Sequence, residues 1–174
     1  MLLTYQNLKI RDAAPEDAQQ LCEWWNDGRV MAHAGFPQGI HTTPEEVARQ
    51  LLPDSDDTFR RLILEVDGTP TGELCVRNHG GGTAEIGIKI CDLPQQGRGC
   101  GTLALQMLLT HLFARGYRRV ILDTDLENAR AQHVYEKLGF RRLRVNRDVW
   151  TNQMGEPRSS VDYELLPPQF TPLE

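Results

Sequence analysis

The sequence Asp92-Leu-Pro-Gln-Gln-Gly-Arg-Gly-Cys-Gly-Thr102 joins a strand-like run to a strongly apolar, helix-like run. Its alternating glycines let the backbone turn tightly and approach a ligand closely, because no Cβ blocks the approach and a positive φ costs them little. The N–H groups that the following helix leaves unpaired point into this turn, where the helix dipole favours negative charge. The stretch is therefore typical of a phosphate-binding loop, although a strand-to-helix loop without a ligand gives the same pattern.

Length and composition indicate one globular domain. The chain has 174 residues, 40% of them hydrophobic and 25% charged, with a net charge of −5. This acidic balance argues against nucleic acid as a partner and mildly favours a cationic substrate. No apolar run is long enough for a membrane helix, and the N-terminus lacks a signal-peptide pattern, so we expect a cytoplasmic protein. The four cysteines form no Cys-x-x-Cys pair, which predicts free thiols and no metal site.

Hydrophobic periodicity predicts an α+β chain. The expected elements are a strand (8–11), helices (about 16–26 and 43–52), three strands (61–66, 71–77 and 83–91), the glycine-rich loop, a buried helix closed by Gly116, a strand (119–124), a helix (128–138) and two last strands (141–150 and 160–165). In the strand before the loop, the side chain of Glu85 lies on the face opposite to Ile86, Ile88 and Ile90.

A loop over residues 28–43 separates the first two predicted helices and is the expected place for substrate specificity. The aromatic side chains of Trp24, Trp25 and Phe36 lie in or next to it. They are the candidate substrate-binding residues, although aromatic residues at a helix end more often belong to the core.

Two motifs resemble signatures of the GCN5-related N-acetyltransferase (GNAT) superfamily. Residues 96–101, Gln-Gly-Arg-Gly-Cys-Gly, match its Gln/Arg-x-x-Gly-x-Gly/Ala loop, and residues 128–140, Asn-Ala-Arg-Ala-Gln-His-Val-Tyr-Glu-Lys-Leu-Gly-Phe, look like its second signature. The resemblance spans about residues 8–165 and leaves 166–174 as a C-terminal tail. It implies a single acetyltransferase-like domain over residues 1–174, with a mixed, mostly antiparallel central sheet flanked by about four helices.

The resemblance also implies acetyl-coenzyme A as the cofactor. Backbone N–H groups of residues 96–101, with Thr102, would hold its pyrophosphate, and the backbone near Ile90 and Cys91 would pair with its pantetheine amides. Cys91 or a close neighbour would supply the N–H that faces the thioester oxygen. The cofactor-binding residues implied in this way are Ile90, Cys91, Gln96, Gly97, Arg98, Gly99, Cys100, Gly101, Thr102, Asn128 and Tyr135. Asn128 is at the same time a natural helix N-cap.

Two residues are the catalytic candidates. Tyr135 matches the tyrosine that the family places to protonate the leaving thiolate, and a tyrosine holds its proton near neutral pH. Glu85, eleven residues before Gln96, is the candidate general base, because some members of the family carry a glutamate there. Burial would have to raise its pKa, and a surface or substrate-binding carboxylate is the alternative role. The alternative bases are Asp123, Asp125 and Glu73.

The expected function is that of an acetyl-coenzyme-A-dependent N-acetyltransferase whose acceptor, a primary amine, attacks the thioester directly. The acceptor is a small amine such as an aminoglycoside or polyamine, a protein N-terminus or a lysine, and the protein is a monomer or homodimer. One alternative is a dinucleotide-binding oxidoreductase, because residues 99–104 also satisfy Gly-x-Gly-x-x-Ala and Asp123 ends the next strand. The other is a non-catalytic coenzyme-A-binding module.

Overall fold

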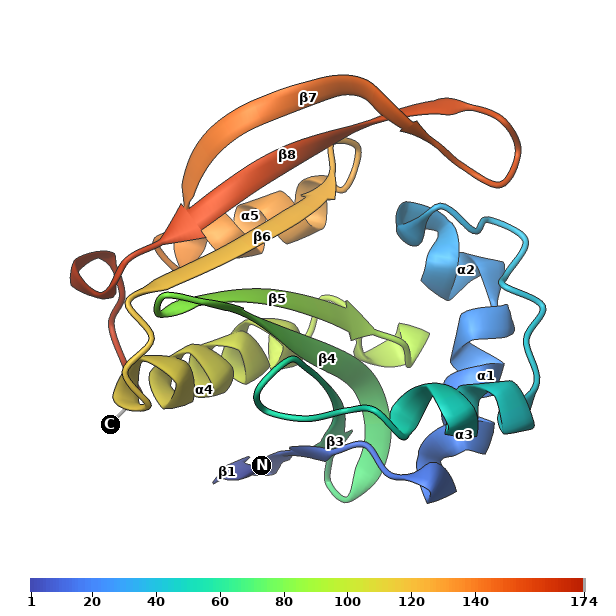
Figure 1. The fold of residues 1–174 in the computed structure, drawn as a ribbon, viewed down its shortest axis with the longest axis horizontal. Helices are drawn as coiled ribbons and strands as arrows, with labels where there is room; N and C mark the ends of the chain where they lie inside the picture. Colours follow the sequence, from blue (N-terminus) through green and yellow to red (C-terminus); the bar gives the residue numbers. More distant parts are fainter. Residues whose placement is uncertain (174) are drawn as a thin grey trace.

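The structure, a computed structural model, describes residues 1–173 (Figure 1). Its helices and strands are β1 (Leu2–Tyr5), β2 (Leu8–Asp12), α1 (Ala18–Asn26), α2 (Gly28–Met31), α3 (Pro44–Leu51), β3 (Phe59–Val66), β4 (Thr69–Gly80), β5 (Thr83–Ile90), α4 (Cys100–Ala114), β6 (Arg119–Asp125), α5 (Ala129–Lys137), β7 (Arg141–Thr151) and β8 (Pro157–Leu165). Short 3-10 turns lie at Pro15–Asp17, Ala32–Ala34, Leu93–Gln95 and Pro167–Gln169. Within the described residues, no helix is long and apolar enough to cross a membrane.

The strands form one sheet in the order β1-β2-β3-β4-β5-β6-β8-β7. Every neighbouring pair is antiparallel except β5 and β6, which are parallel, so the expected mixed and mostly antiparallel sheet is confirmed. The parallel pairing starts at Thr83↔Arg119 and ends at Glu85↔Ile121. Residues Ile86–Ile90 of β5 therefore run on past the point where β6 diverges.

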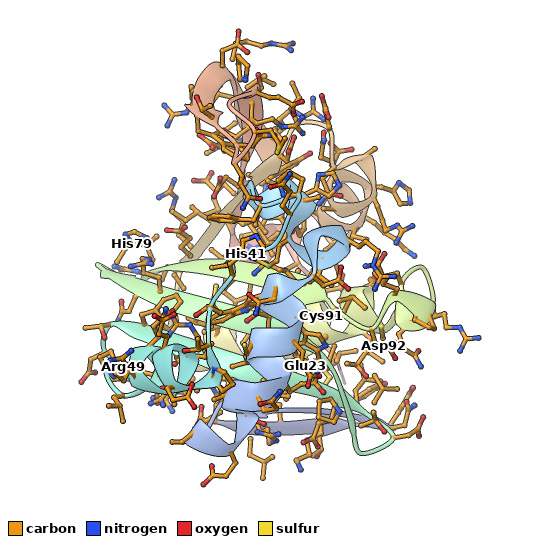
Figure 2. The ribbon with its side chains drawn as sticks, turned by 90° about the vertical axis from the view of Figure 1, so that its right-hand side faces the viewer. Glu23, His41, Arg49, His79, Cys91 and Asp92 are labelled. Carbon is orange, nitrogen blue, oxygen red and sulfur yellow. The ribbon has the colours of Figure 1, made fainter. Side chains whose placement is uncertain are left out.

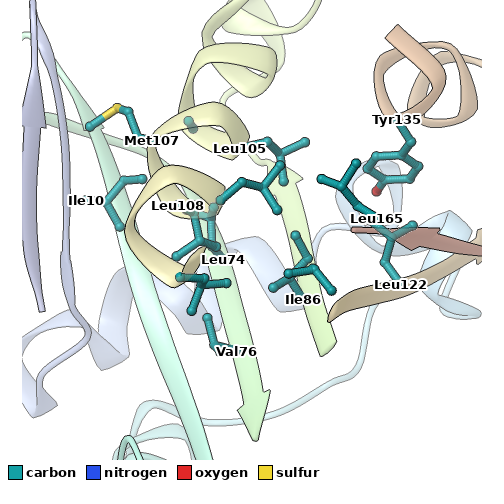
Figure 3. Close-up of a cluster of buried hydrophobic side chains, with 14 of the residues drawn as sticks. Ile10, Leu74, Val76, Ile86, Leu105, Met107, Leu108, Leu122, Tyr135 and Leu165 are labelled. Atoms are coloured by element: carbon teal, nitrogen blue, oxygen red, sulfur yellow. The ribbon is translucent and has the colours of Figure 1, made fainter. Parts of the chain in front are cut away.

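Side-chain alternation gives the sheet two apolar faces. On one face, Leu62 and Leu64 of β3 and Ile86 of β5 pack with the apolar side chains of α4, and the cluster extends to Tyr135 on α5 (Figure 3). On the other face, Ile63 packs with α1 and α3, as does Cys91. The sheet therefore holds the glycine-rich loop and α4 against one face and leaves α1–α3 to cover part of the other.

Three features differ from the sequence-based expectation. Strand β1 pairs with β2 but was not predicted, because its short sequence is not distinctive until β2 offers a partner. A single helical turn, α2, lies inside the predicted loop over 28–43, where Asp27 accepts a hydrogen bond from the Arg29 N–H. The predicted tail packs back onto the domain, since Phe170 is buried and its ring centroid lies 5.5 Å from that of Phe113. Residue 174 of that tail lies outside the described residues.

Candidate active site

The glycine-rich loop has the conformation and the open space that an anionic ligand needs. Gly97 and Gly99 have φ values of +77° and +87°, and a Cβ on either would meet no atom within 4 Å. Gly99 is the N-cap of α4, and the Leu103 N–H bonds to its carbonyl oxygen at 3.1 Å. The N–H groups of residues 100–102 precede that bond and have no carbonyl one turn earlier in the helix. They make the start of α4 a site for negative charge.

Gln96 anchors the loop to the end of β5. Its side-chain Nε2 donates to the Ile90 carbonyl at 2.9 Å, and its Oε1 accepts from Arg130 at 3.0 Å. Its backbone N–H bonds to Leu93 O at 3.1 Å, and the Arg98 N–H bonds to Gln95 O at 3.4 Å. The expectation that the Gln96 and Arg98 N–H groups hold the pyrophosphate therefore needs correction, because the preceding turn uses both.

The Cys100 side chain is buried beneath the same loop, and its Sγ contacts Gln95 O at 3.5 Å. Burial raises the pKa of this thiol. A protonated, buried thiol is a poor nucleophile. Cys100 therefore belongs to the loop through its backbone rather than through thiol chemistry.

The backbone of β5 alternates between two directions. The Cys91 N–H donates to Thr71 O at 2.9 Å, toward β4. The Lys89 carbonyl also points toward β4, because a Cβ on Gly72 of that strand would lie 2.4 Å from the Lys89 O. Because successive backbone groups of a strand point to opposite sides, the N–H and C=O groups of Ile88 and Ile90 face the side of β6. The N–H group expected from Cys91 is therefore already bonded, and its neighbours Ile88 and Ile90 are the ones that face the gap.

Tyr135 projects from α5 and lines a cavity between the helices and the sheet. Its ring packs against Phe140 and Tyr163 with centroid distances of 5.8 and 5.7 Å. Burial, and then the charge of Asp123, raise the pKa of Tyr135, so the hydroxyl keeps its proton at neutral pH. Asn128 caps the same helix by accepting a hydrogen bond from the Ala131 N–H at 3.2 Å. The expected N-cap is confirmed, whereas its contact with the cofactor stays a prediction.

The cavity has a volume of about 630 Å³ and is enclosed by four groups of elements. Its walls include Trp25, Met31, His33, Ile40, Phe59, Arg61, Glu73, Cys75, Gly87, Ile88, Lys89, Asp123, Asp125, Tyr135, Trp150 and Ser160. These residues come from the α1–α2 region, the strands β3–β5, the end of β6 with α5, and the β7–β8 hairpin. The cavity therefore extends from the face covered by α1 to Tyr135.

The three aromatic residues expected to contact substrate have different surroundings. Trp25 lines the cavity, whereas Trp24 is buried in the cluster beneath α1. Phe36 is 37% exposed and is not among the cavity-lining residues. Trp150 was not expected but is in the wall, and its ring packs so closely on Gly35 that a Cβ there would lie 2.6 Å from it. Only the folding of the β7–β8 hairpin toward residue 35 reveals this contact.

A charged pair forms one wall of the cavity. Glu73 and Lys89 lie opposite each other on β4 and β5, with Oε1 and Nζ 2.9 Å apart. The Trp25 Nε1 donates to the same oxygen at 2.9 Å. Burial opposes the charge on Lys89, but the attraction of Glu73 outweighs it and raises the pKa of Lys89. This pair fixes the Trp25 ring against the sheet.

Glu85 lies beside the cavity rather than in its wall. Its Oε2 is 2.6 Å from the Nε2 of His79, and both side chains are about two-fifths exposed, at 37% and 42%. Glu85 lines a neighbouring recess of about 440 Å³. Asp123 lines both this recess and the cavity, so it lies between Glu85 and the cavity interior.

Comparison with known proteins gives consistent matches. Residues 7–141 match the family model of the acetyltransferase (GNAT) domain. The spermidine N(1)-acetyltransferase of Escherichia coli (strain K12) is 36% identical over 137 residues, which cover 77% of this chain and 73% of that protein. A mycothiol acetyltransferase of Cellulomonas flavigena is 34% identical over 133 residues, which cover 70% of this chain but 38% of that protein. The chain thus spans well under half of this second relative.

Solved structures share the fold. RimL, the ribosomal L7/L12 alpha-N-protein acetyltransferase in complex with coenzyme A, superposes with a TM-score of 0.85 at 18% sequence identity. The superposition covers 95% of this chain and 98% of that chain. At this identity the likeness concerns the fold alone.

Replacing Lys89 by Met tests the charged wall. Lys89→Met should lower the free energy of unfolding by about 2–3 kcal/mol, because the Glu73 carboxylate stays buried without its cation. Urea unfolding of both proteins near neutral pH measures the difference.

Lys9→Met is the matched control. Lys9 Nζ pairs with Glu65 Oε2 at 3.0 Å, but Glu65 keeps a second cation when Lys9 is removed, because Arg11 Nε lies 2.6 Å from its Oε1. The loss of Lys9 should cost about 0–1 kcal/mol. Equal losses in the two variants would contradict a buried pair at Glu73.

Proposed function

The chain belongs to the GNAT acetyltransferase family, and from this premise we propose that it transfers the acetyl group of acetyl-coenzyme A to a primary amine by direct attack. Acetyl-coenzyme A is the donor of this family, and coenzyme A is present in the related RimL structure. The observation that carries the proposal is the order of three features along the chain and the sheet. The electropositive start of α4 follows β5, the residues of β5 after Glu85 lie beyond the pairing with β6, and Ile88 of this segment lines the cavity together with Tyr135.

The residues present fit this cofactor. The open space above Gly97 and Gly99 and the N–H groups of residues 100–102 suit a pyrophosphate. The backbone groups of Ile88 and Ile90, which face the gap beside β6, suit the amides of a pantetheine arm, and Asn128 lies at the start of α5 across that gap. When bound, the cofactor supplies an acetyl group activated as a thioester.

The chain's own residues then supply the remaining catalysis. In our proposal the Ile88 N–H donates to the oxygen on which negative charge grows during attack, a contribution that is large in a site shielded from water. Tyr135 donates its hydroxyl proton to the departing sulfur, and its raised pKa keeps that proton available. A carboxylate on the cavity face of the sheet removes a proton from the amine. The sequence points to Glu85 for this step, and the structure places Asp123 between Glu85 and the cavity.

The cavity favours a small cationic amine as the acceptor. Its wall combines the Trp150 ring with the Asp123 carboxylate, which forms no ion pair among the described residues, and this combination suits an ammonium group on an aliphatic chain. Aminoglycosides and polyamines have this chemistry, and one relative is named for spermidine.

Hydrogen bonds join two segments that contribute to the cavity wall. The Gln153 N–H donates to Gly35 O at 2.8 Å, and the Gln153 side chain donates to Gly39 O at 2.9 Å. These bonds tie the β7–β8 hairpin, which carries Trp150, to the loop after α2, which carries Ile40, so we infer that the acceptor enters between fixed walls and is small. A protein N-terminus, the acceptor named for RimL, remains the second candidate because a flexible peptide end is narrow enough to enter.

The oxidoreductase alternative does not fit the fold. A dinucleotide-binding sheet is built from several parallel crossovers, whereas this sheet has one parallel pair. The coincidence of the Gly-x-Gly-x-x-Ala pattern arises because both folds place a glycine-rich turn at the start of a helix.

Thermal unfolding with acetyl-coenzyme A, and separately with NADH, tests the cofactor. A ligand at 100 times its Kd should add about 2.7 kcal/mol of stability, and we expect this from acetyl-coenzyme A alone. Release of free thiol is then measured with spermidine, an aminoglycoside and a peptide with a free N-terminus. Binding of acetyl-coenzyme A without turnover on any amine would contradict the acetyltransferase and support a non-catalytic coenzyme-A-binding module. Stabilisation by NADH alone would contradict both the acetyltransferase and the coenzyme-A-binding module.

Replacing Tyr135 by Phe tests the general acid. Tyr135→Phe should lower kcat about 100-fold while acetyl-coenzyme A still stabilises the variant, because only the proton donor is lost. Tyr163→Phe is the matched control, since the Tyr163 hydroxyl donates to Glu136 at 2.9 Å and is not in the cavity wall. It should lose about 1 kcal/mol of stability and keep its kcat. Equal kcat values for the two variants would remove Tyr135 from the mechanism.

A further inference from the structure

We propose that Asp123, rather than Glu85, removes the proton from the acceptor amine. The inference rests on the proposed transfer to an amine and deepens it. It moves the general base from Glu85, the residue that the sequence favours, to a neighbour on the adjacent strand.

The strand register puts Asp123 next to the reacting groups. Glu85 pairs with Ile121 at the last parallel position, and Asp123 lies two residues further along β6 on the same face. At that point β6 has diverged from β5, and Asp123 lines the cavity together with Tyr135. The charge of Asp123 also acts on the Tyr135 hydroxyl, whose pKa it helps to raise. A proton acceptor and a proton donor therefore share one cavity.

The other carboxylates in the cavity wall are already engaged. Glu73 is bonded to Lys89 and Trp25. Asp125 accepts hydrogen bonds from Arg158 at 2.5 and 3.1 Å and from the Glu127 N–H at 2.9 Å. Among the described residues, Asp123 forms no ion pair. Its carboxylate is therefore the one in this wall that is free to accept a proton.

The groups around Asp123 favour its protonated form at a higher pH than usual. Glu85 lies on β5, and Asp162 pairs directly with Asp123 from β8. Desolvation at the cavity wall, followed by the charges of these two carboxylates, raises the pKa of Asp123, although its side chain keeps contact with solvent. The cations on this side are Arg144 of β7, which bonds to Asp162 at 2.6 Å, Arg119 of β6, which bonds to Glu164 at 2.5 Å, and Arg77 of β4, which lies opposite Glu85 and over the Phe59 ring. The first two are held by other carboxylates, and none of the three forms an ion pair with Asp123.

The remaining titratable groups around the cavity are also accounted for. His33 lies 3.7 Å from Asp125, Lys89 bonds to Glu73, and Arg61 bonds to Asp54 at 3.0 Å. None of these cations bonds to Asp123. A carboxylate with a raised pKa is a better base near neutral pH, because it accepts the proton with a smaller energetic cost.

Glu85 has a different partner and a different place. It lines the neighbouring recess, and its Oε2 lies 2.6 Å from the His79 Nε2. His79 lies toward the end of β4, and Figure 2 shows it at the outer edge of the molecule. Glu85 is therefore engaged with His79 outside the cavity wall, whereas Asp123 is in that wall.

The proton balance requires a base. An ammonium acceptor loses two protons as its nitrogen forms the new C–N bond and the C–S bond breaks. One proton replaces the hydrogen that Tyr135 gives to the departing sulfur, and the other leaves the protein. In our proposal Asp123 takes the proton that leaves and, because its side chain is exposed, releases it to water.

The pH dependence of Asp123→Asn tests the base. The variant should lose about 100-fold in kcat at neutral pH and still be stabilised by acetyl-coenzyme A. In the wild type, the rate should fall at low pH as Asp123 becomes protonated, and we call this fall the acid limb. The variant should lack the acid limb, and its residual rate should rise with pH only as the fraction of free amine grows. Asp162→Asn is the matched control, because Asp162 carries the same charge on the same face but is not in the cavity wall. It should keep the wild-type kcat near neutral pH and only move the acid limb to lower pH, because the charge of Asp162 also raises the pKa of Asp123.

The variant Glu85→Gln distinguishes Asp123 from Glu85 as the base. Removal of a neighbouring negative charge lowers the pKa of Asp123, so the acid limb should move to lower pH without disappearing. An NMR titration of the Asp123 carboxyl carbon in the free protein should show the same shift, independently of turnover. Loss of the acid limb in Glu85→Gln, with a normal limb in Asp123→Asn, would overturn the proposal and make Glu85 the base. A wild type that binds acetyl-coenzyme A but acetylates no amine would instead refute the proposed function itself, and the assignment of Asp123 with it.

Discussion

The divergence of β5 from β6 is the constraint on which the rest of the structure depends. A strand inside a sheet normally bonds to a neighbour on each side, and buried backbone groups without partners are costly. Here the pairing ends at Glu85, and the N–H and C=O groups of Ile88 and Ile90 face outward from the remaining ladder. Gln96 bonds to one of these groups, the carbonyl of Ile90. The others are available to a ligand with amides of its own, which is the chemistry of a pantetheine arm.

The two faces of the sheet have different roles: one packs against α4, and the other lines the cavity. On the face of α4, tightly packed apolar side chains fix the start of that helix and hence the glycine-rich loop. On the opposite face, α1 covers only part of the strands, and the polar side chains of β4, β5 and β6 line the cavity. Tyr135 reaches this cavity from the α4 side because β5 and β6 are apart at that level. A continuous sheet would separate the proton donor from the carboxylates on the opposite face.

The sequence is most informative where structure is local. Gly97 and Gly99, followed by an apolar helical pattern, indicate the loop and the buried helix because the preferences act within a few residues. The direction of the Cys91 N–H could not be predicted, since it depends on the register with Thr71 across β4. Trp150 and the bond between Lys89 and Glu73 were missed for the same reason. Side-chain parity placed Glu85 on the correct face, but only the course of β6 shows that Asp123 lies nearer the cavity.

Amide hydrogen exchange with and without coenzyme A tests the central claim most directly, because it reports on individual backbone groups. The account predicts slower exchange at the N–H groups of Ile88 and Ile90 and at residues 100–102 when coenzyme A is bound, with little change at Cys91, whose N–H already bonds to Thr71. Unchanged exchange at Ile88 and Ile90, with protection elsewhere on the sheet, would contradict the claim that the gap beside β5 holds the cofactor.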